Sequence, residues 1–96
     1  MPGAVRIGDP NSAGGVAIGA GASSVVINGR SACTPGTSVT AHPCCGLPGC
    51  LKHCKAKTTI GSTSVSVEGK PLVYVGSPDT CGHSRALGSL NVIIGV

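Results

Sequence analysis

A short β-type pattern occurs three times along the chain and limits its fold more than any other feature. Each copy has a leading glycine, a small polar residue, and then Val followed two positions later by Ile or Val; the copies are 21–29, 61–69 and 88–94. β-Branched residues that alternate after a turn signal predict a half-buried strand. Asn28-Gly29 and Glu68-Gly69 predict tight turns after the first two copies. The repetition therefore predicts three similar β units.

A second strand is expected to follow each repeat. Residues 30–34 come after the first turn, and residues 70–75 come after the second. Residues 2–7 resemble these second strands, so we expect them to pair with the C-terminal segment 91–96. The chain would then form three hairpins around a pseudo-threefold axis. No segment has a 3.6-residue apolar period, so the expected fold class is all-β with almost no helix.

The expected hydrophobic core is small. The chain has 96 residues with no Trp, no Phe and a single aromatic side chain, Tyr74, among 16 glycines. We expect one domain over 1–96, and a domain of this size buries only about 60–65% of its unfolded surface. A domain with such a core needs additional cross-links, and six cysteines and three histidines could provide them as disulfides or as a bound metal.

Charge and hydropathy exclude several function classes. The formal net charge is +4, and the only cluster of basic residues is Lys52, Lys55 and Lys57, without aromatic side chains for base stacking. We therefore expect no nucleic-acid partner. No stretch reaches the about 20 apolar residues that span a bilayer, and the N-terminus lacks a signal-peptide pattern. A reducing compartment is then expected, which favours metal-bound or free thiols over disulfides.

The acidic residues do not indicate an enzyme. The chain contains only Asp9, Glu68 and Asp79. Glu68 lies in a predicted turn, and the two aspartates follow predicted strands, where the expected role is to cap loop amides. No general acid and base pair is evident, so no catalytic residue is assigned.

The motifs resemble those of a known family of spike-tip proteins. The run from Pro2 to Asp9 is similar to the Pro-Ala-Ala-Arg and Gly-Asp motif that names the PAAR-repeat family. The Gly-Ser-x-x-Val-x-Val-x-Gly blocks, and the Thr-Cys-Gly at 80–82, resemble its other hallmarks. The resemblance covers essentially the whole chain. It implies a small cone of three β-hairpin units with pseudo-threefold symmetry and a metal near the apex. Some members of the family carry toxin domains as extensions, and we expect none over 1–96.

The resemblance also implies a function and partners. One copy would cap a trimeric β-helical spike through the base of the cone and sharpen it for piercing a target membrane. The spike would belong to a type VI secretion system or a contractile phage tail, and both remain open. The protein would be in the bacterial cytoplasm during assembly, and then at the tip of the virion tail or of the secreted spike.

The expected metal is zinc, because imidazole and thiolate donors select zinc. Iron is less favoured. Counting from the glycine after each second strand aligns Ala13, His42 and Cys81, which would converge at the apex. Ala13 stands where the family usually has a ligand histidine, so the first loop contributes none. The expected ligands are His42, His53 and Cys81, with Cys54 as the fourth. Other candidates for the fourth position are His83, as the alternative to Cys54, and Cys44, Cys45 and Cys50.

Other interpretations of the cysteines stay open. Disulfides are one alternative, although Cys44 and Cys45 are a poor pair because adjacent Cα atoms lie only about 3.8 Å apart. Cys33 lies within a strand pattern and is predicted to be a small buried apolar residue. The rival function is a zinc-binding module that uses the Cys/His-rich middle loop to bind nucleic acid or protein.

Overall fold

The fold is all-β, as predicted. The computed structural model describes residues 2–42, 45–50 and 53–94. Within these residues the strands form short antiparallel pairs: β1 (Ala17–Ile18) with β4 (Ser38–Val39), β2 (Ala22–Ile27) with β3 (Arg30–Ala32), and β5 (Ser66–Val67) with β6 (Lys70–Pro71). The same part of the chain contains no helix that is long and apolar enough to cross a bilayer.

Two of the predicted hairpins are present with the expected turns. Ile27 of β2 lies opposite Arg30 of β3, and Val67 of β5 lies opposite Lys70 of β6. The turn residues Asn28 and Glu68 have φ values of 53° and 52°, and a glycine with positive φ follows each of them. Two consecutive positive φ values are the signature of the type I′ turn, which suits the twist of a two-residue hairpin.

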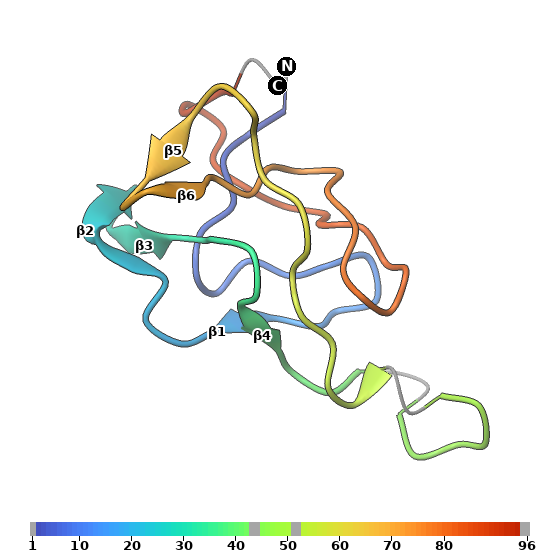
Figure 1. The fold of residues 1–96 in the computed structure, drawn as a ribbon. Coiled ribbons are helices and arrows are strands. Elements are labelled where there is room, and N and C mark those ends of the chain that lie inside the picture. Colours follow the sequence, from blue (N-terminus) through green and yellow to red (C-terminus); the bar gives the residue numbers. More distant parts are fainter. Residues whose placement is uncertain (1, 43–44, 51–52, 95–96) are drawn as a thin grey trace.

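The third unit is closed between the two ends of the chain, as the sequence predicted. Gly3 forms an antiparallel bridge with Ile93. The Ala4 N–H donates to the Val92 carbonyl oxygen at 2.9 Å, and the Ile94 N–H donates to the Pro2 carbonyl oxygen at 2.8 Å. Residues 2–4 and 92–94 lie side by side near the top of Figure 1.

The leading glycine of the repeats, and the serine that follows it at positions 62 and 89, have the same structural roles in different units. The Ser62 hydroxyl accepts hydrogen bonds from the N–H groups of Ser64 and Val65, and the Ser89 hydroxyl accepts them from Asn91 and Val92. A Cβ on Gly88 would lie 2.7 Å from the Ala4 carbonyl oxygen. The leading glycine is therefore required because a neighbouring backbone passes over it.

A closed ring of backbone hydrogen bonds joins the three units. The Val5 N–H donates to the Val73 carbonyl oxygen at 2.9 Å, and the Val73 N–H donates to the Cys33 carbonyl oxygen at 3.0 Å. The Cys33 N–H donates to the Val5 carbonyl oxygen at 3.0 Å, which closes the ring. All three side chains are completely buried and pack with Ala17. Since the ring closes after three steps, the second strands surround a pseudo-threefold axis. Cys33 is a buried free thiol, as predicted, and burial raises its pKa.

Small apolar clusters lie on both sides of this ring. The larger cluster packs between the hairpins and includes Ile27, Val67 and Ile94, which occupy the same position in the three repeats. A smaller cluster among the loops contains only Val39, Ala56 and Cys81. Apolar contacts are therefore fewest among the loops, where the histidines lie.

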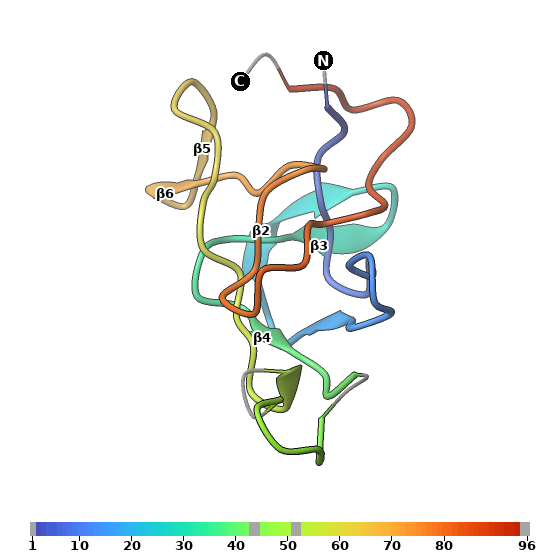
Figure 2. The ribbon, with the colours of Figure 1, turned by 90° about the vertical axis from the view of Figure 1, so that its right-hand side faces the viewer.

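The molecule is elongated, with extents of 38 × 24 × 21 Å. Residues 2–4 and 92–94 lie at one end, which we call the terminal end, and residues 45–50 lie at the opposite end, the loop end (Figures 1 and 2). A loop follows each second strand, and antiparallel bridges close the three loops at Pro10 and Val16, Ser38 and Lys57, and Pro78 and Ser84. We call them loop 1 (8–17), the middle loop (36–58) and loop 3 (76–85).

Candidate metal centre

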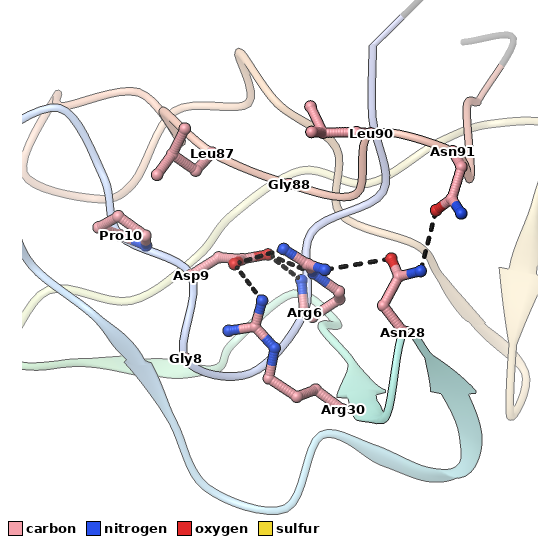
Figure 3. A pocket seen from close by; sticks show the side chains of 10 residues that line it. All are labelled: Arg6, Gly8, Asp9, Pro10, Asn28, Arg30, Leu87, Gly88, Leu90 and Asn91. Carbon is pink, nitrogen blue, oxygen red and sulfur yellow. Dashed lines mark hydrogen bonds and ion pairs between the residues drawn. The ribbon is translucent and has the colours of Figure 1, made fainter.

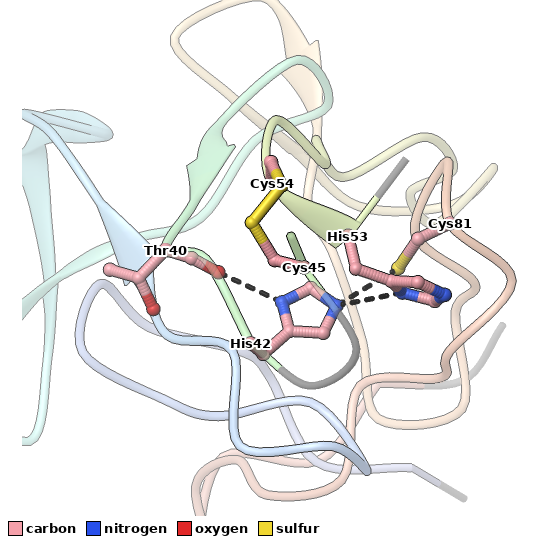
Figure 4. Close-up of a disulfide and its surroundings, with 6 residues drawn as sticks. All are labelled: Thr40, His42, Cys45, His53, Cys54 and Cys81. Atoms are coloured by element: carbon pink, nitrogen blue, oxygen red, sulfur yellow. Dashed lines mark hydrogen bonds between the residues drawn. A yellow bond between two sulfur atoms is a disulfide. The ribbon is translucent and has the colours of Figure 1, made fainter. Parts of the chain in front are cut away.

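Three histidines and a cysteine converge near the loop end. His42 and His53 come from the middle loop, and Cys81 and His83 come from loop 3. One donor atom from each of the four side chains lies within 4.8 Å of all the others. The His42 Nε2 atom is 3.2 Å from His53 Nδ1 and 3.5 Å from the Cys81 sulfur. Figure 4 shows His42, His53 and Cys81 turned toward one another.

Backbone hydrogen bonds bring the two loops together. The His42 N–H donates to the His53 carbonyl oxygen at 3.2 Å, which closes the middle loop between its two histidines. The Thr80 N–H donates to the Lys57 carbonyl oxygen at 2.8 Å, which attaches loop 3 to the middle loop. A tight turn then places Cys81 and His83 on the same loop tip, with Gly82 between them at a φ of 92°.

The orientation of His42 suits a metal ligand. Its Nδ1 atom is 2.8 Å from the Thr40 carbonyl oxygen. A carbonyl only accepts hydrogen bonds, so Nδ1 carries the proton and Nε2 directs its lone pair toward the other donors. Metal-binding histidines commonly donate their second ring N–H to a backbone carbonyl in this way. His42, His53 and Cys81 are buried and His83 is half-buried, so the centre is largely shielded from water.

The donor set and its spacing fit one four-coordinate metal ion. Bonds of about 2.0–2.3 Å in a tetrahedron separate the ligand atoms by about 3.3–3.8 Å. The distances of 3.2 Å and 3.5 Å from His42 Nε2 are close to these separations. All the separations are within 4.8 Å, so the four side chains could hold one metal ion if the more distant donors moved closer by about 1 Å.

The structure brings together three of the four expected ligands and replaces the fourth. His42, His53 and Cys81 belong to the group, whereas Cys54 does not, because its sulfur forms a disulfide with Cys45. The structure therefore places Cys54 outside the group, and His83, its alternative in the sequence, is the fourth member. Among the other candidates for this position, Cys50 is disulfide-bonded and Cys44 lies outside the described residues.

A buried ion pair within loop 3, which no sequence pattern indicated, also holds loop 1 through hydrogen bonds. The Arg85 guanidinium lies 3.0 Å from the Asp79 carboxylate, and both side chains are completely buried. Arg85 also donates to the carbonyl oxygens of Asp9 and Gly15, and Asn11 donates to Asp79. Asp79 was expected to cap loop amides, and the structure instead places it against Arg85. Its spacing from Arg85 gave no signal of burial.

A separate open hollow lies between the first and third units (Figure 3). Asp9 at its edge pairs with Arg6 at 2.9 Å and with Arg30 at 3.1 Å. Arg6 donates to Asn28, which in turn donates to Asn91. The charged groups of this hollow are therefore occupied with one another, and they connect the two units instead of forming a metal-binding cluster.

Comparison with known proteins adds no relative. A scan against protein-family models found no match for the chain, and a search of curated proteins also found none. The fold and the His/Cys group are therefore the basis for assigning a function.

Proposed function

We propose that the chain is a PAAR-type spike-tip protein that caps and sharpens the trimeric β-helical spike of a contractile injection machine. The observation that carries the proposal is the hydrogen-bonded ring of Val5, Cys33 and Val73. It gives a single chain three equivalent sides, and a single chain with three equivalent sides can match a trimer in one-to-three stoichiometry. The sequence resemblance to PAAR repeats supports the same conclusion.

The terminal end is the proposed surface for the spike. Val25, Val65 and Val92 occupy the same position in the three repeats. Val25 and Val65 are half-buried against the larger apolar cluster, and Val92 is 38% exposed. A trimer presents the same residue three times around its axis, so each copy could meet one of these valines.

The loop end is the proposed piercing end, and zinc is the metal proposed for it. His42, His53, Cys81 and His83 would hold the ion. Four protein ligands leave no open coordination position, so the site would be structural. Structural zinc contributes on the order of 10–16 kcal/mol of apparent binding free energy in small peptides. That contribution would compensate for the small cluster of Val39, Ala56 and Cys81 between the loops.

The test is complex formation with trimeric β-helical spike proteins from the same genome, measured by size-exclusion chromatography with light scattering. We expect one chain per trimer. Val92→Asp should weaken the complex by at least about tenfold, because binding would bury an unpaired carboxylate. Leu47→Asp is the matched control, since Leu47 is 60% exposed at the loop end, and it should leave the complex intact.

Two results would contradict the proposal. One is the absence of a complex with any such spike at every mixing ratio. The other is salt-dependent binding to DNA or RNA, which would favour the alternative of a zinc-binding module that recognises nucleic acid.

A further inference from the structure

A disulfide closes the middle loop directly beside two of the four metal-site residues. Cys45 and Cys54 are bonded to each other and are nine positions apart. Cys54 follows His53 in the chain, and the Cys45 N–H donates to the His42 carbonyl oxygen at 2.8 Å. We call these four residues, His42, Cys45, His53 and Cys54, the neck of the middle loop (Figure 4).

We propose that Cys45 and Cys54 are positioning residues of the metal centre, and that the redox state of their disulfide sets its metal affinity. The inference rests on the metal site of the proposed function. Between His42 and His53, the only other backbone link described across the neck is one hydrogen bond of 3.2 Å. Without the disulfide, the intervening loop gains conformational freedom that metal binding must then remove.

The disulfide also decides which donors are offered to the metal. A free Cys54 thiolate would be a soft donor adjacent to His53, and zinc binds thiolates well. In the disulfide, Cys54 has no thiolate, and Figure 4 shows its side chain directed to Cys45 while His53 points toward Cys81. The oxidised neck thus leaves three imidazoles and the Cys81 thiol as the set, with Cys81 a free cysteine.

The redox step is an ordinary thiol–disulfide exchange. A dithiol reductant attacks one sulfur of the Cys45–Cys54 bond and then closes to its own cyclic disulfide. Two electrons and two protons pass to the chain, which gains two thiols as the sulfur–sulfur bond breaks. Zinc has no redox chemistry of its own and takes no part in the electron transfer.

The test measures zinc affinity by competition with a chelating dye, and coordination by the visible spectrum of the Co²⁺-substituted protein. The oxidised chain is compared with Cys45→Ser/Cys54→Ser, which removes this disulfide alone. It is also compared with the chain reduced by a phosphine, which opens the disulfide of Cys50 as well and becomes a phosphine oxide with oxygen from water. We expect zinc affinity about 10–100-fold weaker in both, the range found when residues that orient metal ligands are changed. The Co²⁺ spectrum of the double variant, which has no thiol at position 54, should retain a single thiolate contribution, from Cys81.

Two control variants separate this inference from the metal site itself. Cys33→Val removes a thiol that packs with Val5 and Val73, outside the neck, and installs the residue found at those equivalent positions, so zinc affinity should not change. His42→Ala should abolish tight binding. The metal site is wrong if the oxidised chain binds no zinc, or if the His42→Ala variant binds zinc as tightly as the wild-type chain. In either case the inference is wrong as well.

Other outcomes overturn the inference alone. One is zinc binding that needs His42 but is as tight in the reduced chain and in the double variant as in the oxidised chain. Another is a second thiolate contribution to the Co²⁺ spectrum of the oxidised chain, where the disulfide leaves Cys81 as the only thiol of the set. Folding is monitored by hydrogen exchange at Val5, Cys33 and Val73. Loss of protection there in both the reduced chain and the double variant would assign the disulfide a general structural role.

Discussion

Arg85 is a completely buried arginine in a chain that has few large apolar side chains. Its guanidinium reaches the Asp79 carboxylate at 3.0 Å and the carbonyl oxygens of Asp9 and Gly15 at 3.1 Å and 3.0 Å. A buried charge is tolerated only when it is paired and hydrogen-bonded. Arg85 therefore fills the space between loops 1 and 3 that an aromatic residue could fill in another protein.

We expect Asp79→Ala to lower the free energy of unfolding by about 3–5 kcal/mol, because it leaves the Arg85 charge buried without its partner. Urea unfolding with a chelator present would measure the effect apart from metal binding. The double variant Asp79→Ala/Arg85→Met removes both charges and should lose less stability than Asp79→Ala alone. A loss below about 1 kcal/mol for Asp79→Ala would show that the pair does not stabilise the fold.

The hairpins are linked by contacts from a turn to a neighbouring repeat. Glu68, in the turn between β5 and β6, accepts hydrogen bonds from the backbone N–H and the hydroxyl of Ser24 in β2. Asn28, in the turn between β2 and β3, donates to Asn91 at 2.9 Å. Ser24 and Asn91 occupy the same position in their repeats. The turn residues therefore connect neighbouring units as well as reversing the chain.

The Glu68 contact predicts a dependence of stability on pH. Its hydrogen bonds with Ser24 lower the pKa of Glu68 below the ordinary value of 4.5. The unfolded chain then binds the proton more readily, so the contribution is complete above about pH 4.5 and is lost as the pH falls through the folded pKa. The stability difference between the wild-type chain and Glu68→Gln, from thermal unfolding, should shrink on acidification.

Ser24→Ala is the second variant for this test, because it removes the hydroxyl donor and leaves the carboxylate in place. It should reduce the same acid-dependent difference. Glu68 is fully exposed, so the effect should be small. A difference between wild type and Glu68→Gln that stays constant with pH would contradict the assignment.

At the scale of the whole molecule, we expect metal removal to act on one end. The proposed zinc ligands belong to the middle loop and loop 3, whereas the ring of Val5, Cys33 and Val73 is held by its own backbone hydrogen bonds. Treatment with a chelator should therefore speed amide hydrogen exchange at His42, His53 and Cys81 far more than in the ring. Hydrogen-exchange mass spectrometry would measure this, and an equal increase throughout the chain would argue against a local metal staple.

Much of the fold is predictable because its signals are local. The Asn28-Gly29 turn, the alternating valines and isoleucines, and the leading glycines each act within a few residues. The pairing of residues 2–4 with 92–94 was predictable from repetition, because residues 2–7 resemble the second strands at 30–34 and 70–75. His42, His53 and Cys81 were predictable as candidates because few other residues in the chain can bind a soft metal.

The tertiary structure alone decided the fourth member of the group and the burial of Arg85. His53 and Cys54 are neighbours in sequence with equally suitable donors, so composition and spacing could not choose between Cys54 and His83. The choice depends on where Cys45 meets Cys54 and where loop 3 crosses the middle loop. In the same way, Arg85 is buried because Asp9 and Gly15 approach it from loop 1, about 70 positions away, a contact that no local pattern encodes.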